Sequence, residues 1–180
     1  KLGIDYIEGG YAASNQKEMS FFADIKKLNL KNSKIVAFGS THRADTKPSE
    51  DISLNSILAC NTEAATLVGK TWDFQVKEVL GCSLEKNLKL WADSVKLLKK
   101  KELEIIFDAE HFFDGFKANR EYAIKILEAA SSAGADVIVL CDTNGGTLPY
   151  QIFEITSCIC KQFSGLTIGI HTHNDTDCAT

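Results

Sequence analysis

The sequence predicts an α/β protein built around a parallel sheet, and three observations support this. Six short apolar segments alternate with five longer segments whose apolar residues recur every three or four positions. The short segments are apolar almost without interruption, which is typical of strands buried on both faces of a parallel sheet. Polar and ionisable residues gather directly after these segments, where the carboxyl ends of parallel strands meet. The pattern is typical of a doubly wound sheet or of a TIM barrel.

The first predicted strand is Ile4–Ile7, a β-branched and aromatic run that ends at two glycines. The helix after it begins near Asn15, a potential N-cap with Glu18 three residues later, as in a capping box. Its apolar residues then recur at helical spacing. The second predicted strand, Lys34–Phe38, stops at Gly39.

A short helix is predicted over Ile52–Ala59, followed by a third strand over Ala65–Val68. The segment Lys70–Gly81 is expected to be a loop. Ser83 is a potential cap for the next helix, in which apolar residues repeat every three or four positions. These are Leu84, Leu88, Trp91, Val95 and Leu98.

The C-terminal half continues the alternation. Strands are predicted over Glu104–Phe107, Val137–Leu140 and Thr167–Ile170. One helix runs from Asn119 to a stop near Gly134, because asparagine favours N-caps and glycine favours helix C-termini. The last helix carries apolar residues from Ile152 to Phe163 and is expected to end at a glycine.

Composition limits the possible partners. The chain has 180 residues, 44% hydrophobic and 24% charged, as in an ordinary globular domain. Its net charge of −4 argues against a nucleic-acid partner. No apolar run approaches the roughly 20 residues needed to span a membrane, so no membrane partner is expected. Its six cysteines contain no CxxC pair, which favours reduced thiols and a cytoplasmic location.

The polar residues after the strands favour the barrel. No GxGxxG or GxxxxGK[ST] motif follows any strand, which disfavours a nucleotide-binding sheet. In a barrel these residues meet on one rim, the face where barrel active sites lie. They are Glu8, Ser40, Thr41, Arg43, Lys70, Trp72, Asp73, Asp108, Glu110, Asp142, Thr143, Asn144, His171, His173, Asn174 and Asp175.

The run GIHTHND places His171 and His173 two residues apart at the end of the last strand. Residues at this spacing point to the same face of a strand, so two imidazoles form half of a metal site. The alternative is a pair of histidines hydrogen-bonded to their neighbours. With a carboxylate and open positions, such a pair suits Zn²⁺ or Mn²⁺, and the same set is typical of non-haem iron.

Six motifs together resemble the family of citramalate, 2-isopropylmalate and homocitrate synthases, which are related to HMG-CoA-lyase-like metal-dependent TIM barrels. The resemblance runs from end to end of the chain. It implies an acyltransferase that condenses acetyl-CoA with a 2-oxo acid, foremost pyruvate to (R)-citramalate, in isoleucine and leucine biosynthesis. The motifs are DYIEGG (Asp5–Gly10), FGST (Phe38–Thr41), GKTWDF (Gly69–Phe74), DAEHFFDGFKAN (Asp108–Asn119), VLCDTNGGTLP (Val139–Pro149) and GIHTHND (Gly169–Asp175).

The resemblance also implies a single catalytic-barrel fragment over residues 1–180. Its six strands would be strands two to seven of eight, because family members begin with a strand carrying an Arg–Asp pair in a DTTLRDG-like run. A complete TIM barrel takes about 250 residues. We therefore expect the 180-residue chain to be inactive by itself, and the full-length protein to be a homodimer, as the family suggests.

Site residues follow from the same resemblance. His171 and His173 match the family's metal ligands, Glu110 matches a catalytic-site glutamate, and Thr143 matches a threonine that contacts the 2-oxo acid. Arg43, on the same rim, is expected to bind substrate. His42 and Gln75 stand where the family usually carries arginine and histidine, which bears on substrate preference.

The implied chemistry is a Claisen-type condensation. A divalent metal (Mg²⁺, Mn²⁺ or Zn²⁺) would polarise the keto group of the 2-oxo acid. A base removes a proton from the methyl group of acetyl-CoA, the co-substrate. The enolate attacks the keto carbon, and water cleaves the thioester. Glu110 would orient the reactants or move a proton, and its alternative role is a salt bridge to Arg43 or Lys70. Thr143 would bind the substrate carboxylate, and its alternative role is to cap the next helix.

Two other functions remain open from the sequence. One is the reverse chemistry, a metal-dependent lyase or aldolase like hydroxymethylglutaryl-CoA lyase. The other is an inactive barrel fragment that acts only as a binding module.

Overall fold

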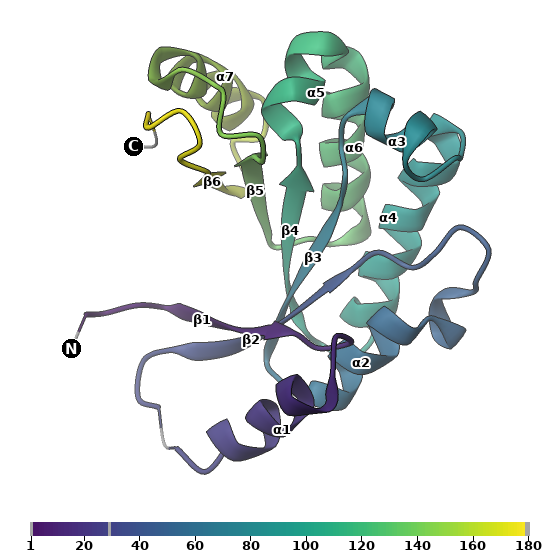
Figure 1. The fold of residues 1–180 in the computed structure, drawn as a ribbon, viewed down its shortest axis with the longest axis vertical. Coiled ribbons are helices and arrows are strands. Elements are labelled where there is room, and N and C mark those ends of the chain that lie inside the picture. The colour runs from purple at the N-terminus through teal and green to yellow at the C-terminus, as the bar shows by residue number, and fades with distance from the viewer. Residues whose placement is uncertain (1, 29, 179–180) are drawn as a thin grey trace.

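The computed structural model of the chain describes residues 2–28 and 30–178 (Figure 1). Six strands form one sheet in the order β1-β2-β3-β4-β5-β6, and every neighbouring pair is parallel. The sheet curls, and the helices cover its convex side. This confirms the predicted α/β class and the partial parallel barrel. The strands are β1 (Tyr6–Tyr11), β2 (Lys34–Ser40), β3 (Ala64–Lys70), β4 (Glu104–Glu110), β5 (Val137–Asp142) and β6 (Thr167–Thr172).

Each strand is joined to the next by at least one α-helix. Single α-helices join β1 to β2, β2 to β3 and β5 to β6, whereas two helices each lie between β3 and β4 and between β4 and β5. The helices are α1 (Gln16–Ile25), η1 (Pro48–Glu50, a 3₁₀ turn), α2 (Ile52–Cys60), α3 (Asp73–Glu78), α4 (Leu84–Lys99), α5 (Phe112–Ala118), α6 (Arg120–Ala133) and α7 (Pro149–Gln162). None of the described helices is long and apolar enough to cross a membrane.

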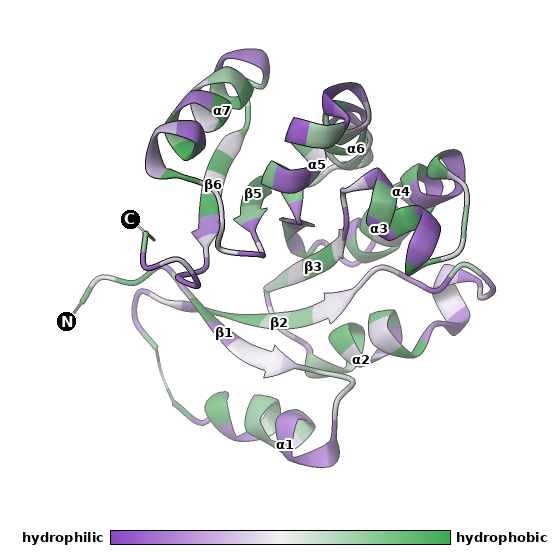
Figure 2. Ribbon diagram, turned by 45° about the horizontal axis from the view of Figure 1, so that its top comes forward, coloured by the Kyte–Doolittle hydropathy of each residue, from purple (hydrophilic) through white to green (hydrophobic). Residues whose placement is uncertain are grey.

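Side chains alternate between the two faces of the strands, and this separates the core into two clusters. The larger cluster joins the convex face to the helices, with the Trp91 ring centroid 3.8 Å from that of Phe107. A Cβ at Gly69 would collide with the Trp91 ring, so glycine allows α4 to pack closely on β3. Figure 2 shows helices carrying both hydrophobic and hydrophilic residues around the curved sheet.

The smaller cluster lies on the concave face. Val36, Ala64 and Ile106 are buried there, with Val137 and Val139 packed against them. Residues an even number of positions apart on a strand point to the same face. Ile106 and Asp108 on β4 therefore share the concave face, with the polar residue nearer the carboxyl end of the strand. The concave face is therefore apolar in its middle and polar toward the carboxyl ends of the strands.

The predicted helix starts are confirmed by hydrogen bonds. Asn15 accepts one from the Glu18 N–H at 3.0 Å, Ser83 from Lys86 at 3.1 Å, and Asn119 from Tyr122 at 3.2 Å. Such caps satisfy backbone donors that have no partner within the helix. The predicted stop at Gly134 is also confirmed, since this C-cap has a φ of 106°.

Three predictions of local structure were wrong. The expected loop Lys70–Gly81 contains α3, and α5 precedes the helix expected from Asn119. These helices have six and seven residues, too few to show a clear 3.6-residue period. The first strand is Tyr6–Tyr11 rather than Ile4–Ile7, because a register shift between Glu8 and Tyr11 lets the glycines join the sheet.

At the amino ends of the strands, Glu104 accepts hydrogen bonds from two neighbours. The Lys34 ammonium lies 2.6 Å from its carboxylate, and the Tyr6 hydroxyl lies 2.5 Å away. The bonds from Lys34 and then Tyr6 hold the pKa of Glu104 below its ordinary value of 4.5. The ionised form is therefore favoured in the folded state.

The substitution Glu104→Gln tests this network. A carboxyl whose pKa is lowered on folding stabilises the protein above its unfolded pKa, and this contribution is lost as the pH falls through the folded value. Below about pH 4.5 the wild type should lose stability faster than the variant, with a difference of about 1 kcal/mol or less. Urea unfolding from pH 3 to pH 7 measures it. Glu128→Gln, on the exposed side of α6, is the control, and equal pH profiles for all three proteins would contradict the account.

Candidate active site

Polar side chains from neighbouring strands meet at the carboxyl ends of the sheet, as the sequence predicts. Lys70 and Glu110 are register partners on β3 and β4, and the Lys70 Nζ atom lies 2.8 Å from a Glu110 oxygen. One of the two ion pairs considered for Glu110 is thus present. The pair is three-quarters buried, so the ammonium fixes the position of the carboxylate.

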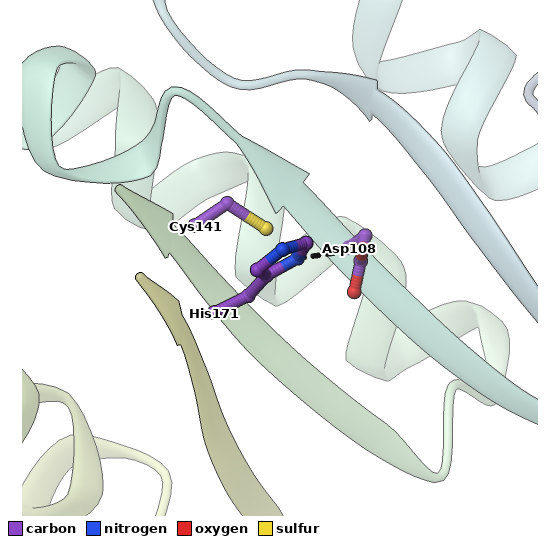
Figure 3. Close-up of side chains that lie close together, drawn as sticks. All are labelled: Asp108, Cys141 and His171. Carbon is purple, nitrogen blue, oxygen red and sulfur yellow. Dashed lines mark ion pairs between the residues drawn. The ribbon is translucent and has the colours of Figure 1, made fainter. Parts of the chain in front are cut away.

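Three further side chains meet beside this pair. Asp108, Cys141 and His171 come from β4, β5 and β6, and one potential ligand atom of each lies within 4.8 Å of the others (Figure 3). The register explains the arrangement: Cys141 is opposite His171, and Asp108 is opposite Val139, two residues before Cys141. Residues directly opposite each other in a sheet project to the same face.

The cluster is electrostatically unfavourable for anions. The pKa of Asp108 is raised to about 6, first by burial and also by the charges of Glu8 and Glu110, while the nearby His171 opposes the shift. The Asp108 carboxylate lies 3.6 Å from Nδ1 of His171. Burial, followed by the charges of Asp108, Glu110 and Glu8, also raises the pKa of the Cys141 thiol. A cation at this point would relieve the repulsion.

Of the two histidines predicted as metal ligands, the structure places only His171 in this cluster. The His173 ring stacks on the His171 ring, with centroids 5.0 Å apart and an interplanar angle of 21°. The two rings therefore lie on one side, as their spacing predicts. His171 is half-exposed and reachable, with a side-chain exposure of 54%.

The donor atoms in this region fit a divalent cation. Imidazole nitrogen and carboxylate oxygen are ordinary ligands of Zn²⁺ and Mn²⁺, and a free coordination position would be open to substrate. Within residues 2–28 and 30–178, no other group of three or more His, Cys, Asp or Glu side chains has comparable ligand spacing.

A cavity of about 580 Å³ opens beside the Lys70–Glu110 pair. Arg43 lines it from the loop after β2, and Val79 and Leu80 line it from the turn before α4. Asp51 accepts the Arg43 backbone N–H at 3.0 Å and also caps α2, so the loop is held in place. The guanidinium has no ion-pair partner in the part of the chain that the structure describes.

The predicted substrate ligand Thr143 contacts His111, the residue that follows Glu110 in the chain. Its hydroxyl oxygen accepts the His111 backbone N–H at 2.8 Å and keeps its own proton available for donation. The alternative role as a helix cap is wrong, because α7 begins after Leu148. His111 adopts a left-handed conformation with φ of 57°, a form of backbone strain that clusters at functional sites.

Asp142 holds the turn after β5 in place. Its carboxylate accepts hydrogen bonds from the Thr147 N–H at 3.1 Å and the Thr147 hydroxyl at 2.8 Å. The Trp72 ring packs on the rings of Phe74 and His111. The two unusual residues also have partners: His42 bonds to the Arg43 and Thr46 carbonyls, and Gln75 lies 3.4 Å from His111.

The sequence analysis missed Cys141 and left Asp108 without a role. The run Ile105–Glu110 alternates strictly between convex-face apolar residues and concave-face residues, which marks Asp108 and Glu110 as sharing a face. Cys141 gave no signal of its own, because a cysteine within an apolar strand resembles a small hydrophobe. Its proximity to His171 depends on the register of two strands.

The curled parallel sheet, its outer helices and the ionisable rim define a partial α/β barrel with its candidate active site at the strand ends. The chain belongs to the HMGL-like family, whose model matches residues 1–180.

Individual relatives agree with this assignment. An (R)-citramalate synthase of Geobacter sulfurreducens is 52% identical over 179 residues, and one of Aquifex aeolicus is 50% identical over 178. Each match covers 99% of the chain, which spans 34% of the length of either relative. The structure of hydroxymethylglutaryl-CoA lyase from Pseudomonas aeruginosa has a TM-score of 0.77 at 14% identity, over 97% of this chain and 58% of that one. This last similarity concerns the fold.

The loops after β5 and β6 brace each other at Gly145. This residue has a φ of +61°, and a Cβ here would lie 2.8 Å from the Asp175 nitrogen. The Thr176 hydroxyl donates to the Gly145 carbonyl at 2.7 Å. The chain therefore makes a tight turn at Gly145, and the segment after His173 packs directly against it.

Gly145→Ala should destabilise the protein by about 1 kcal/mol or more, because the conformation and the neighbouring loop both exclude a side chain. Gly146→Ala is a matched control, since a Cβ at Gly146 meets nothing within 4 Å. Urea unfolding of both variants measures the difference. Equal midpoints would show that the two loops are not tightly packed.

Proposed function

We propose that this chain forms part of the active site of an acyltransferase that condenses acetyl-CoA with pyruvate to give (R)-citramalate. The observation that carries the proposal is the 52% identity, over 99% of the chain, to a protein named (R)-citramalate synthase. The rim adds chemical support, because a cluster of potential metal ligands lies there beside a carboxylate and a cavity. On this proposal the chain is a catalytic-barrel fragment of a larger enzyme.

His171 and His173 would supply nitrogen ligands to a divalent metal, Mg²⁺, Mn²⁺ or Zn²⁺. When bound, such an ion polarises the keto group of the 2-oxo acid as a Lewis acid. The exposed His171 ring and the neighbouring His173 ring lie on the open side of the cluster, where a small substrate has access.

Glu110 is proposed as the group that moves a proton. Its carboxylate is positioned by Lys70 at 2.8 Å and lies at the wall of the cavity, where the methyl group of acetyl-CoA would approach. Removal of that methyl proton lets the carbon attack the keto carbon. Hydrolysis of the thioester then releases coenzyme A as a free thiol.

Thr143 and Arg43 are proposed to bind the anionic substrates. The Thr143 hydroxyl proton is free to donate to the carboxylate of the 2-oxo acid, because its oxygen already accepts from His111. Arg43 faces the cavity together with Lys70, and its charge suits a carboxylate or phosphate group. Val79 and Leu80 give the same cavity an apolar wall for the thioester arm.

The cellular setting is proposed from the cysteines and from the relatives. All six cysteines are free thiols, which supports a cytoplasmic location. The role in isoleucine biosynthesis is proposed from the similarity to proteins named (R)-citramalate synthase. The homodimer is proposed from the family resemblance alone.

The test is a thiol-release assay on the protein produced with any sequence that flanks this chain in its gene. The metal-loaded protein is given acetyl-CoA and a panel of 2-oxo acids, and pyruvate should give the fastest release. Release only with a longer 2-oxo acid would keep the reaction and change the substrate. No release with any of them, together with cleavage of hydroxymethylglutaryl-CoA, would contradict the proposal and establish the lyase.

Glu110→Gln should lower the rate of thiol release by roughly 10²- to 10⁴-fold, because the amide cannot take up a proton. His171→Ala should abolish release through loss of the metal. Glu154→Gln, on the exposed surface of α7, is the matched control and should keep the wild-type rate. A Glu110→Gln variant with full activity would remove Glu110 from the mechanism.

A further inference from the structure

His42 lies at the cavity beside the Lys70–Glu110 pair, yet its side chain is only 4% exposed. Its backbone N–H donates to the Ser94 hydroxyl at 3.0 Å, and that hydroxyl donates to the Leu90 carbonyl at 2.7 Å. These two bonds tie the loop after β2 to α4. The position of the imidazole ring is therefore fixed from the backbone outward.

The two ring nitrogens of His42 have different surroundings. Nδ1 lies 2.9 Å from the Arg43 carbonyl oxygen and 3.1 Å from that of Thr46. Because a carbonyl oxygen can only accept, Nδ1 carries the proton and donates it. Nε2 is buried and has no hydrogen-bond partner among the described residues. An unpaired buried nitrogen is unfavourable, so histidine at this position serves the contacts of Nδ1.

Arg43 is held by its backbone on both sides. Its N–H donates to the Asp51 carboxylate at 3.0 Å, and its carbonyl accepts from the His42 ring. The Thr46 N–H donates to the same carbonyl at 3.2 Å and closes a turn. The Arg43 side chain is exposed and lines the cavity, so this fixed backbone aims a charged group that a ligand can reach.

We propose that His42 is a positioning residue: through Nδ1 it holds Arg43 at the mouth of the cavity, where the guanidinium binds a phosphate group of acetyl-CoA. The inference rests on the proposed function for the identity of this ligand. It also explains why a buried imidazole stands in the loop with only one of its nitrogens bonded.

The depth of the lining residues favours the phosphate end of the co-substrate. Glu110 is three-quarters buried, and the thioester would lie beside it, whereas Arg43 is exposed. A small 2-oxo acid beside Glu110 would be covered, but the nucleotide end of a long co-substrate extends to the mouth. A guanidinium binds phosphate through two parallel hydrogen bonds, so its placement matters.

Two amide substitutions separate the roles of the ring nitrogens. The side-chain nitrogen of asparagine occupies the place of Nδ1, whereas that of glutamine reaches the place of Nε2. Thiol release is measured on the protein produced with any sequence that flanks this chain in its gene. His42→Gln should raise the KM for acetyl-CoA roughly 10- to 100-fold, with kcat and the KM for pyruvate unchanged. His42→Asn should keep the KM of the wild type.

Two controls show whether the effect passes through Arg43 and a phosphate. With S-acetylpantetheine, which lacks the phosphates, the wild type and His42→Gln should have the same kcat/KM. In an Arg43→Gln background, His42→Gln should cause no further loss, because residues that act as a unit are not additive. Equal KM values for His42→Asn and His42→Gln, a raised KM for pyruvate, or additive losses would overturn the proposal.

The tautomer of His42 gives a readout that does not depend on activity. Nitrogen-15 NMR of the wild-type imidazole should show the proton on Nδ1, with the signal assigned by its loss in His42→Asn. A proton on Nε2 alone would overturn the inference, even if His42→Gln did not fold.

Calorimetric binding of coenzyme A separates this inference from the proposed function. Weaker binding to His42→Gln than to His42→Asn, without thiol release with any 2-oxo acid, would leave the inference standing and remove the proposed function. Thiol release with the same KM for acetyl-CoA in both variants would do the opposite.

Discussion

Every strand of the sheet runs in the same direction, and neighbours in the sheet are neighbours in the chain. Each connection must therefore return outside the sheet to the amino end of the next strand, which places the helices on the convex side. The carboxyl ends of all six strands consequently share one edge. Residues separated by 30 positions or more become neighbours at this edge because their strands pair in the sheet. Examples are Asp108, Cys141 and His171.

The alternation of side chains along each strand places the packing residues and the candidate site residues on opposite faces of the sheet. Convex-face residues such as Phe107 pack with the helices, while the concave-face residue beside each one is available for the site. The ionised form of Asp108 is disfavoured at this site, because burial and the charges of Glu8 and Glu110 raise its pKa. Proteins keep such unfavourable groups mainly where function requires them. A divalent cation bound at the rim would replace this repulsion between carboxylates with attraction to the ion.

The sequence predicted the parts of this structure that depend on local patterns. Short-range signals predict six strands, the bounds of the first one excepted, and they also predict the caps at Asn15, Ser83 and Asn119. The rim position of Glu110 follows from the same signals. The helices α3 and α5 were missed because they are too short to show a period. The ion pair of Glu110 with Lys70 was one of two alternatives, and the register of β3 and β4 decided between them. The nearness of Cys141 to His171 is likewise a matter of register, which the composition of either strand leaves open.

The central claim is that the carboxyl ends of β4, β5 and β6 hold a metal ion where the 2-oxo acid binds. Anomalous diffraction from crystals grown with Zn²⁺ and pyruvate tests it most directly, since it locates the ion independently of activity. The account predicts the strongest anomalous peak beside the His171 imidazole, with electron density for pyruvate on the open side of the ion. A principal peak elsewhere on the protein, or pyruvate bound away from His171, would contradict it.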